Sequence, residues 1–296
     1  MTTAAIPDLC LPGLVRTASQ VRAQVVEHEQ MARNTWRLRL ECPAVARQIL
    51  PGQFFMIRLP GRSDPLLGRP FALYDVYCDA AGQAQGIDFG YVVVGKMTTL
   101  LESLRPGDSV EVWGPLGNGF PTPPEGHLVI VAGGIGQTPF LAVIREALRR
   151  RAYGDPARVL AGVPSRITLC YGVRSKEYLA GVAEFEREGI DVRIATDDGS
   201  AGHHGFVTDL LKDLIAEPSA PAAVYCCGPE PMMHAVSRLT TAAGVPCWLS
   251  LETPMACGFG ACFSCVTRVK QDDGAWDYRR VCVEGPVFPA SQLVLD

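Results

Sequence analysis

Four cysteines near the C-terminal end constrain this chain more than any other feature of its sequence. Cys257, Cys262 and Cys265 follow the spacing Cys-x4-Cys-x2-Cys, and Cys282 comes after sixteen further residues. This is the ligand order of a plant-type [2Fe–2S] cluster. The glycines between the first two cysteines let the backbone wrap tightly and turn its N–H groups toward the sulfurs. Because such a cluster moves one electron at a time, the spacing predicts a role in electron transfer.

Two other uses of these cysteines stay open. Structural zinc usually takes Cys-x2-Cys pairs, and only Cys262 and Cys265 form one. Disulfides are less favoured, because residues 1–14 lack the basic start and apolar run of a signal peptide. Eleven cysteines is an odd total that fits a reduced, cytoplasmic protein. Six other thiols are interpreted as small core or surface residues: Cys10, Cys42, Cys78, Cys170, Cys226 and Cys247.

Length and charge narrow the possible functions. A chain of 296 residues is long enough for two domains with cores of their own. The formal net charge of −4 argues against nucleic acid as a partner. The densest basic cluster, residues 149–151, is interpreted as the solvated end of a helix. No apolar stretch of about 18 residues occurs, so we expect no membrane-spanning segment and no membrane partner.

The first half of the chain has the pattern of a β domain. Within residues 20–123, stretches such as 35–40, 53–59 and 88–94 have strand character and are separated by turn residues. This pattern predicts an antiparallel β-barrel that is interrupted by one helix near residues 98–103. Residues 1–19 are treated as an N-terminal extension without an assigned role.

The second half alternates strands and helices, which predicts a Rossmann-like α/β domain with a parallel sheet over residues 124–252. The expected strands are 127–132, 167–171, 192–196, 223–227 and 247–251, and the expected helices are 139–151, 179–188, 208–214 and 231–243. Residues 253–296 then form a cluster-bearing segment. Because this segment is too short for an ordinary core, we expect the cluster itself to hold it together.

Three short motifs predict nucleotide binding, although each also has a purely structural interpretation. The turn 133–139, Gly-Gly-Ile-Gly-Gln-Thr-Pro, contains a good N-cap in Thr138 and a suitable first helical residue in Pro139. The free N–H groups of such a helix start can take a phosphate. Residues 227–232, Cys-Gly-Pro-Glu-Pro-Met, follow a parallel strand at the end where ligands bind in open α/β sheets. Arg69 suits bidentate binding of phosphate oxygens.

Taken together, these motifs resemble the ferredoxin-reductase-like flavoproteins, and among them the electron-transfer subunits of class 1B dihydroorotate dehydrogenases, over residues 20–290. The resemblance implies the cofactors FAD, NAD and a [2Fe–2S] cluster. It assigns FAD to Arg69, Pro70, Phe71, Ala72, Tyr91, Val92, Val93, Gly95, Met97 and Thr98. It assigns NAD to Gly133, Gly134, Gly136, Thr138, Pro139, Cys227, Gly228, Pro229 and Met232. Ala72 and Met97 depart from the Ser or Thr and the Gly that the family carries at these positions.

The implied mechanism rests on electron counting. NADH gives up two electrons together as a hydride, whereas the cluster accepts one, so a flavin must stand between them. The resemblance implies that the cluster exchanges electrons with the FMN of a separate catalytic subunit that holds dihydroorotate, in a heterotetramer serving pyrimidine biosynthesis. No acid–base set for pyrimidine chemistry is evident, and His203 and His204 are interpreted as surface residues. We therefore expect no catalytic residue for dihydroorotate in this chain.

Several alternatives remain at this stage. The chain could be the FAD and [2Fe–2S] subunit of a sulfide dehydrogenase, of a bifurcating NAD(P)H–ferredoxin oxidoreductase or of a hydrogenase. It could serve an oxygenase, although such a reductase usually carries a full ferredoxin domain. From another class, it could be a zinc-stapled nucleotide-binding regulator. NADP also competes with NAD, because no acidic residue ends the second parallel strand while Arg174 and Lys176 lie nearby.

Overall fold

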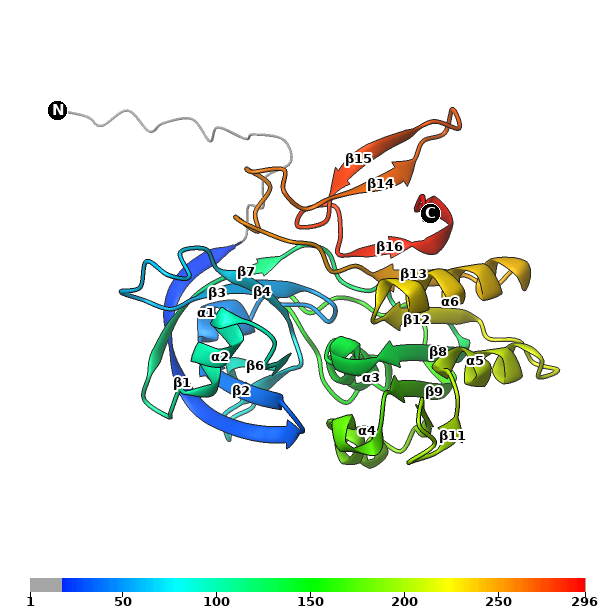
Figure 1. Ribbon diagram of the computed structural model, residues 1–296, viewed down its shortest axis with the longest axis horizontal. Coiled ribbons are helices and arrows are strands. Elements are labelled where there is room, and N and C mark those ends of the chain that lie inside the picture. Colours follow the sequence, from blue (N-terminus) through cyan, green and yellow to red (C-terminus); the bar gives the residue numbers. More distant parts are fainter. Residues whose placement is uncertain (1–17, 296) are drawn as a thin grey trace.

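A curved antiparallel sheet forms the first domain of the computed structural model, which describes residues 18–295 (Figure 1). The strand order is β4-β3-β7-β1-β2-β6-β5. The sheet closes between β4 and β5, where the N–H of Leu73 donates to Gln53 O at 3.1 Å and that of Tyr74 to Asp88 O at 2.8 Å. This arrangement is the predicted antiparallel barrel. Its elements are β1 (Ser19–Ala32), β2 (Thr35–Glu41), α1 (Pro43–Ala46), β3 (Phe54–Arg58), β4 (Arg69–Ala72), β5 (Asp75–Cys78), β6 (Ala84–Val92), α2 (Lys96–Glu102) and β7 (Ser109–Leu116).

The longest strand of the barrel, β1, is not predicted by the sequence pattern. Polar residues dominate this segment, and only Ala23 and Val25 are fully buried in it. One face of an antiparallel strand can remain in water, so a strand of this kind has a weak hydrophobic signal. It nevertheless pairs with β2 on one side and with β7 on the other. The strand begins at Ser19, and residues 1–17, including Cys10, lie outside the described residues.

The second domain is built on a seven-stranded sheet with the order β11-β10-β9-β8-β12-β13-β16, in which every neighbouring pair is parallel except β13 and β16. This is the predicted α/β domain. Its strands are β8 (Gly126–Gly133), β9 (Pro164–Val173), β10 (Asp191–Thr196), β11 (His203–His204), β12 (Ala223–Cys227), β13 (Cys247–Ser250) and β16 (Val287–Pro289). Its helices are η1 (Gly134–Gln137), α3 (Phe140–Ala147), η2 (Lys176–Tyr178), α4 (Val182–Arg187), α5 (Val207–Ile215), α6 (Glu230–Ala242) and η3 (Ala290–Gln292).

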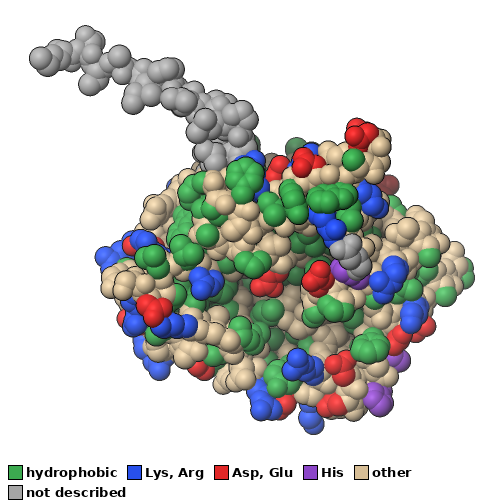
Figure 2. Space-filling model, turned by 45° about the horizontal axis from the view of Figure 1, so that its top comes forward, with side chains coloured by type: hydrophobic (Ala, Val, Ile, Leu, Met, Phe, Trp, Pro, Cys, Tyr) green, Lys and Arg blue, Asp and Glu red, His purple; other side chains and the backbone are tan. Residues whose placement is uncertain are grey.

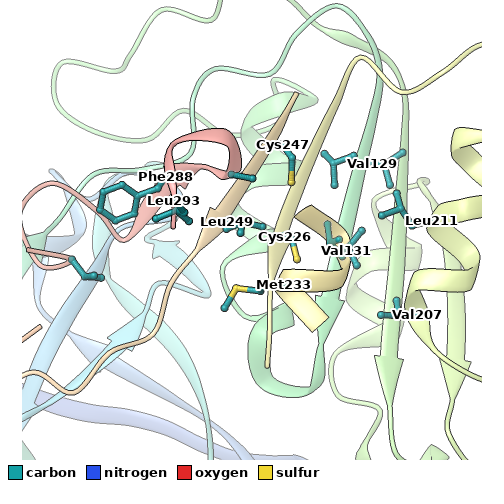
Figure 3. Close-up of a cluster of buried hydrophobic side chains, with 14 of the residues drawn as sticks. Val129, Val131, Val207, Leu211, Cys226, Met233, Cys247, Leu249, Phe288 and Leu293 are labelled. Carbon is teal, nitrogen blue, oxygen red and sulfur yellow. The ribbon is translucent and has the colours of Figure 1, made fainter. Parts of the chain in front are cut away.

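Helices cover both faces of this sheet because its central strands are apolar on both sides. Val129 and Val131 of β8 pack with α5 and α6 in one buried cluster (Figure 3). Leu128 and Ile130 face the opposite way and pack with α3 and α4. The strand order reverses between β8 and β12, so their carboxyl ends form the crevice where open α/β sheets bind ligands.

The C-terminal segment is attached to both domains. The hairpin β14 (Val266–Lys270) and β15 (Trp276–Arg280) projects from the body, whereas β16 adds an antiparallel strand beside β13 (Figure 1). Phe288 and Leu293 pack in the buried cluster that contains Leu249 of β13 (Figure 3). The expectation that the cluster alone holds this segment is therefore too narrow, because strand pairing and apolar contacts anchor it as well.

The helix predicted for residues 139–151 ends at Ala147, and the arginines that follow it are not simply solvated. Arg150 pairs with Glu188 at 2.6 Å, and Arg151 pairs with Asp75 of the barrel at 2.7 Å. The interpretation of residues 149–151 as a solvated helix end is incomplete: Arg149 and Arg150 are exposed, but Arg150 and Arg151 are also ion-paired. Two of these arginines neutralise carboxylates that are almost fully buried, one of them across the boundary between the domains.

Candidate functional site

The predicted flavin motif begins with an exposed arginine on β4. Arg69 donates from Nη1 to the carbonyl oxygens of Leu67 and Gly68, both at 3.0 Å. Within the described residues it has no carboxylate partner, so its charge is available to a ligand. Pro70, Phe71 and Ala72 are partly exposed beside it. A free guanidinium at the rim of the barrel suits a phosphate group.

The second flavin segment divides between core and surface. Tyr91 is buried in the barrel, and its hydroxyl lies 2.9 Å from His28 Nε2. His28 Nδ1 lies 3.0 Å from Leu104 O, and a carbonyl can only accept. In neutral His28, Nδ1 therefore carries the proton and Nε2 accepts from Tyr91. Met97 is also buried in the barrel core, which leaves Val92, Val93, Gly95 and Thr98 nearer the surface.

Thr98 caps the turn that begins α2. Its Oγ1 accepts from the backbone N–H groups of Val94 and Gly95, both at 3.0 Å. These contacts fix the backbone that the resemblance assigns to FAD. The substitution of a glycine by Met97 is accommodated because the methionine side chain turns into the barrel core.

The two predicted dinucleotide loops pack against each other at the reversal point of the sheet. A β-carbon built on Gly136 would lie 2.4 Å from Cys227 O. One built on Gly133 would lie 2.6 Å from Met232 Sδ and 2.7 Å from Pro229 Cδ. Only glycine leaves room for this close approach, so the structure brings both motifs together as the sequence predicts.

The start of the helix after the first loop differs from the prediction. Thr138 is not the N-cap: the turn η1 precedes α3, and Thr138 Oγ1 donates to Ile135 O at 2.9 Å. Pro139 itself occupies the N-cap position. The first free N–H groups therefore belong to the turn that Gly134 opens and not to α3. A β-carbon on Gly90 of the barrel would lie 2.7 Å from Thr138 Cγ2, so this turn also adjoins the flavin domain.

Two polar residues of this region are not among the predicted site residues. Gln137 is fully buried, and neither its amide oxygen nor its amide nitrogen has a hydrogen-bond partner in the described part of the chain. An unsatisfied buried polar group costs about 1–3 kcal/mol, which a bound ligand or water would offset. The sequence signal that could have identified Gln137 as a site residue is a glutamine within an otherwise apolar, glycine-rich turn. Ser250 is the second, because it hydrogen-bonds the Cys227 thiol.

The chemistry around Cys227 favours a neutral thiol. Burial, followed by the negative charge of Glu252, raises the pKa of Cys227 to about 12, and the Ser250 hydrogen bond opposes this shift. The thiol consequently stays protonated near neutral pH. It can pack against a ligand or donate a weak hydrogen bond there, but it is not a thiolate nucleophile.

The four cysteines of the C-terminal motif stand as two pairs. Cys262 lies close enough to Cys257, and Cys282 to Cys265, for the second thiol of each pair to influence the pKa of the first. Cys257 also interacts electrostatically with Cys282, which brings the two pairs together. No three His, Cys, Asp or Glu side chains within residues 18–295 converge in a way that suits a single metal ion. Two thiolates for each of two irons is the ligand set of a [2Fe–2S] cluster, and two pairs of thiols fit it.

Local backbone shape and polarity also suit this ligand set. Gly258 and Gly260 adopt φ of 80° and 97°, which side chains disfavour. A hydrogen bond from Ser264 lowers the pKa of Cys262 to about 6, whereas burial raises the pKa of Cys282. Cys265 and Cys282 are buried, and Cys262 is exposed. The pair that contains Cys262 is thus the one nearer to solvent.

Comparison with known proteins agrees with the three kinds of site. Residues 22–120 match the oxidoreductase FAD-binding domain, and residues 130–238 match the oxidoreductase NAD-binding domain. Residues 252–294 match the iron-sulfur cluster binding domain of dihydroorotate dehydrogenase B. No helix in the described part of the chain is long and apolar enough to cross a membrane.

Curated relatives match along almost their whole length. The dihydroorotate dehydrogenase B (NAD(+)) electron transfer subunit of Geobacillus thermodenitrificans is 38% identical over 277 residues, which is 93% of this chain and 98% of the relative. The corresponding subunit of Desulforamulus reducens is 36% identical over 274 residues, which is 92% of this chain and 97% of the relative. A solved NADH-dependent reduced ferredoxin-NADP oxidoreductase, described for flavin-based electron bifurcation, has a TM-score of 0.77 and 29% identity over 93% of this chain and 90% of its own. The chain therefore belongs to the family of dihydroorotate dehydrogenase B electron transfer subunits.

Proposed function

We propose that this chain carries electrons between NAD(H) and the FMN of a separate dihydroorotate dehydrogenase catalytic subunit, through its own FAD and [2Fe–2S] cluster. The arrangement of the cysteine segment carries this proposal. Trp113 and Asn118 of the flavin domain hydrogen-bond it, while β16 joins the sheet of the NAD domain. A one-electron carrier held in this way would adjoin both the flavin domain and the NAD domain.

The division of labour follows from electron counting. NADH releases two electrons together, and FAD is the cofactor that can receive them as a pair and pass them on singly. We assign the phosphates of FAD to Arg69, whose charge has no carboxylate partner in the described residues, and to the backbone that Thr98 fixes. Tyr91 and Met97 contribute indirectly, as core residues beneath that surface.

We assign the dinucleotide to the paired loops, with Gly133, Gly134 and Gly136 providing close backbone approach and Gln137 an unused amide. The assignment to NAD has support from the neighbouring strand end. The N–H of Asp197 donates to Val173 O at 3.1 Å and that of Asp198 to Arg174 O at 3.2 Å, so two exposed acidic residues stand beside Arg174 at the end of β9. Carboxylates there favour a ribose hydroxyl over a 2′-phosphate.

We assign the four cysteines of the motif to the cluster and the adjoining surface to the catalytic subunit. Phe259, Phe263, Trp276 and Tyr278 are 40%, 63%, 47% and 55% exposed in the cysteine loop and the hairpin that follows it. Figure 2 shows hydrophobic side chains gathered near the top of the molecule, where this segment lies. Exposed aromatic residues are enriched where proteins bind each other. Two chains of each kind would complete the assembly, and the free thiols suit the reducing cytoplasm.

A second candidate function has one specific observation in its favour. The neighbouring structure described for electron bifurcation covers 93% of this chain with a TM-score of 0.77. A chain of the same architecture could exchange its electrons with ferredoxin or with a second flavin subunit instead of dihydroorotate.

Co-purification from the native source separates these two functions. Fractions would be assayed for dihydroorotate-dependent NAD reduction and for an FMN-containing partner. We expect both to follow this chain. Co-elution with a different flavoprotein, without dihydroorotate activity, would contradict the pyrimidine assignment and leave the cofactor assignments standing.

A further inference from the structure

One tryptophan of the flavin domain touches the cysteine loop directly. The indole Nε1 of Trp113, on β7, donates a hydrogen bond to the backbone carbonyl of Cys257 at 2.8 Å. The two residues are 144 positions apart in the chain. The side chain is partly buried against a cluster that contains Met56 and Leu116 of the barrel together with Cys265 and Cys282.

The far edge of the same ring lies against the start of the flavin motif. A β-carbon built on Gly68 would lie only 2.4 Å from Trp113 Cη2, so the ring occupies the space that a side chain would need. The carbonyl oxygen of Gly68 accepts from Arg69 Nη1 at 3.0 Å. A continuous series of contacts therefore runs from Arg69 through Gly68 and Trp113 to Cys257.

The cysteine loop is seated on the barrel at this place. A β-carbon built on Gly258 would lie 2.6 Å from Met56 Cγ and 3.1 Å from Leu116 Cδ1. Met56 and Trp113 are paired residues on the neighbouring strands β3 and β7. The packing of Gly258 on the barrel and the hydrogen bond from the indole N–H together fix the position of the cysteine loop relative to strands β3 and β7.

We propose that Trp113 is a positioning residue that sets the separation between the flavin-binding strand and the cluster. The proposal rests on the proposed function. With its cofactors bound, the chain would take a hydride from NADH onto the flavin together with a proton from solvent. The flavin would pass the two electrons singly to the cluster and return its protons to solvent; in the purified chain the first electron would reduce the cluster, and in the assembly the partner's acceptor would empty the cluster before the second. Because electron transfer slows steeply with distance, a loosened loop delays the step from flavin to cluster and not the step from NADH to flavin.

Trp113→Phe tests this role, because phenylalanine keeps an aromatic ring at this position but loses the indole N–H and the outer ring edge that lies against Gly68. Trp36→Phe is the matched control: Trp36 lies in the same barrel, and its indole nitrogen is buried without a partner among the described residues. Two quantities would be followed on the purified chain with its cofactors. Stopped-flow absorbance gives the rates of flavin and cluster reduction by NADH, and hydrogen exchange gives the protection of the amides in residues 255–260.

We expect Trp113→Phe to reduce its flavin at the wild-type rate, to reduce its cluster severalfold more slowly and to exchange its loop amides about fivefold faster, as for the loss of one hydrogen bond. In Gly68→Ala the new β-carbon would collide with the outer edge of the Trp113 ring and displace it. This variant should also reduce its cluster more slowly, and it replaces Trp113→Phe in the test if that variant does not fold. Wild-type cluster reduction and protection in both variants would overturn the inference. A wild-type cluster that NADH does not reduce would overturn the proposed function itself.

Discussion

The side-chain amide of Asn118 pairs with the backbone of Val287 in both directions. Its nitrogen donates to Val287 O at 2.8 Å, and its oxygen accepts from Val287 N–H at 2.9 Å. The same nitrogen also reaches Glu284 O at 3.1 Å. One asparagine after the last barrel strand thus holds the edge strand of the other domain's sheet and fixes the cysteine segment between the two domains.

Replacing Asn118 with Ala should therefore loosen the C-terminal segment. The change leaves buried backbone groups of Val287 without partners, which costs about 1–3 kcal/mol. We expect a lower thermal midpoint and faster loss of iron to a chelator. Gln292→Ala removes an exposed amide from the same segment and is the control. Equal iron release from both variants would show that Asn118 does not anchor the segment.

Cys262→Ser should abolish the cluster while NADH-to-dye activity through the flavin continues. Serine is a poor replacement for a thiolate ligand, so one iron loses half of its protein ligands. Iron content, visible absorbance and the electron paramagnetic resonance of the reduced protein measure the loss. Cys78→Ser, which removes another exposed thiol, should retain full iron. Unchanged iron in the Cys262 variant would refute the ligand assignment.

The cluster ligands, the barrel and the parallel sheet could be predicted because each depends on patterns among residues that are close together in the sequence. Ligand spacing, turn residues and apolar runs are short-range signals. The attachment of the cysteine segment could not be predicted in this way. Its hydrogen bonds from Trp113 and Asn118 join side chains to backbone groups more than 140 residues away, and such contacts leave no periodic pattern.

The same limit explains the arginines after α3. Residues 150 and 151 have the composition of a solvated helix end, and only the fold places Glu188 and Asp75 opposite them.

Thr138 illustrates a different limit of prediction from sequence. Its sequence context is that of an N-cap, but the extra turn η1 moves the helix start by one residue. Boundaries of this kind depend on how glycine-rich loops pack against each other.

Arg69→Ala should weaken FAD retention. A charge-assisted hydrogen bond to phosphate contributes about 1.5–3 kcal/mol, which corresponds to roughly a tenfold to hundredfold weaker binding. The flavin content after dialysis and a titration of the apoprotein with FAD measure this effect. Arg62→Ala removes an exposed arginine from the preceding loop and should keep its flavin. Full occupancy in the Arg69 variant would exclude the phosphate role.

Gly136→Ala should raise the KM for NADH and leave both chromophores in place. The new β-carbon would collide with the backbone at Cys227 and Gly228 and push the two loops apart. Gly244→Ala is the comparison, because Gly244 lies outside both loops, its β-carbon would meet nothing within 4 Å and only its φ of 67° opposes the change. An unchanged KM in the Gly136 variant would mean that these loops do not hold the dinucleotide.

His127 should make the stability of the second domain depend on pH. The ring is 6% exposed, and its Nε2 lies 2.9 Å from Thr168 Oγ1. Burial, and then the positive charge of Arg166, lower its pKa from the usual value near 6.5. The unfolded chain therefore takes up this proton first as the pH falls. The stabilising contribution is present above about pH 6.5 and is lost as the pH falls through the lower pKa of the folded state.

The measurement is the thermal midpoint at pH 7.5 and at pH 5.5. We expect the midpoint to fall on acidification in the wild type and to fall less in His127→Gln, because glutamine can keep the contact with Thr168 but does not titrate. His204→Gln, on the exposed edge strand β11, serves as the control and should follow the wild type. Burial raises the pKa of Asp88, so this carboxyl group also responds to acidification, and the difference between the variants isolates the contribution of His127. Equal acid sensitivity in all three proteins would show that His127 remains neutral or solvated in both states.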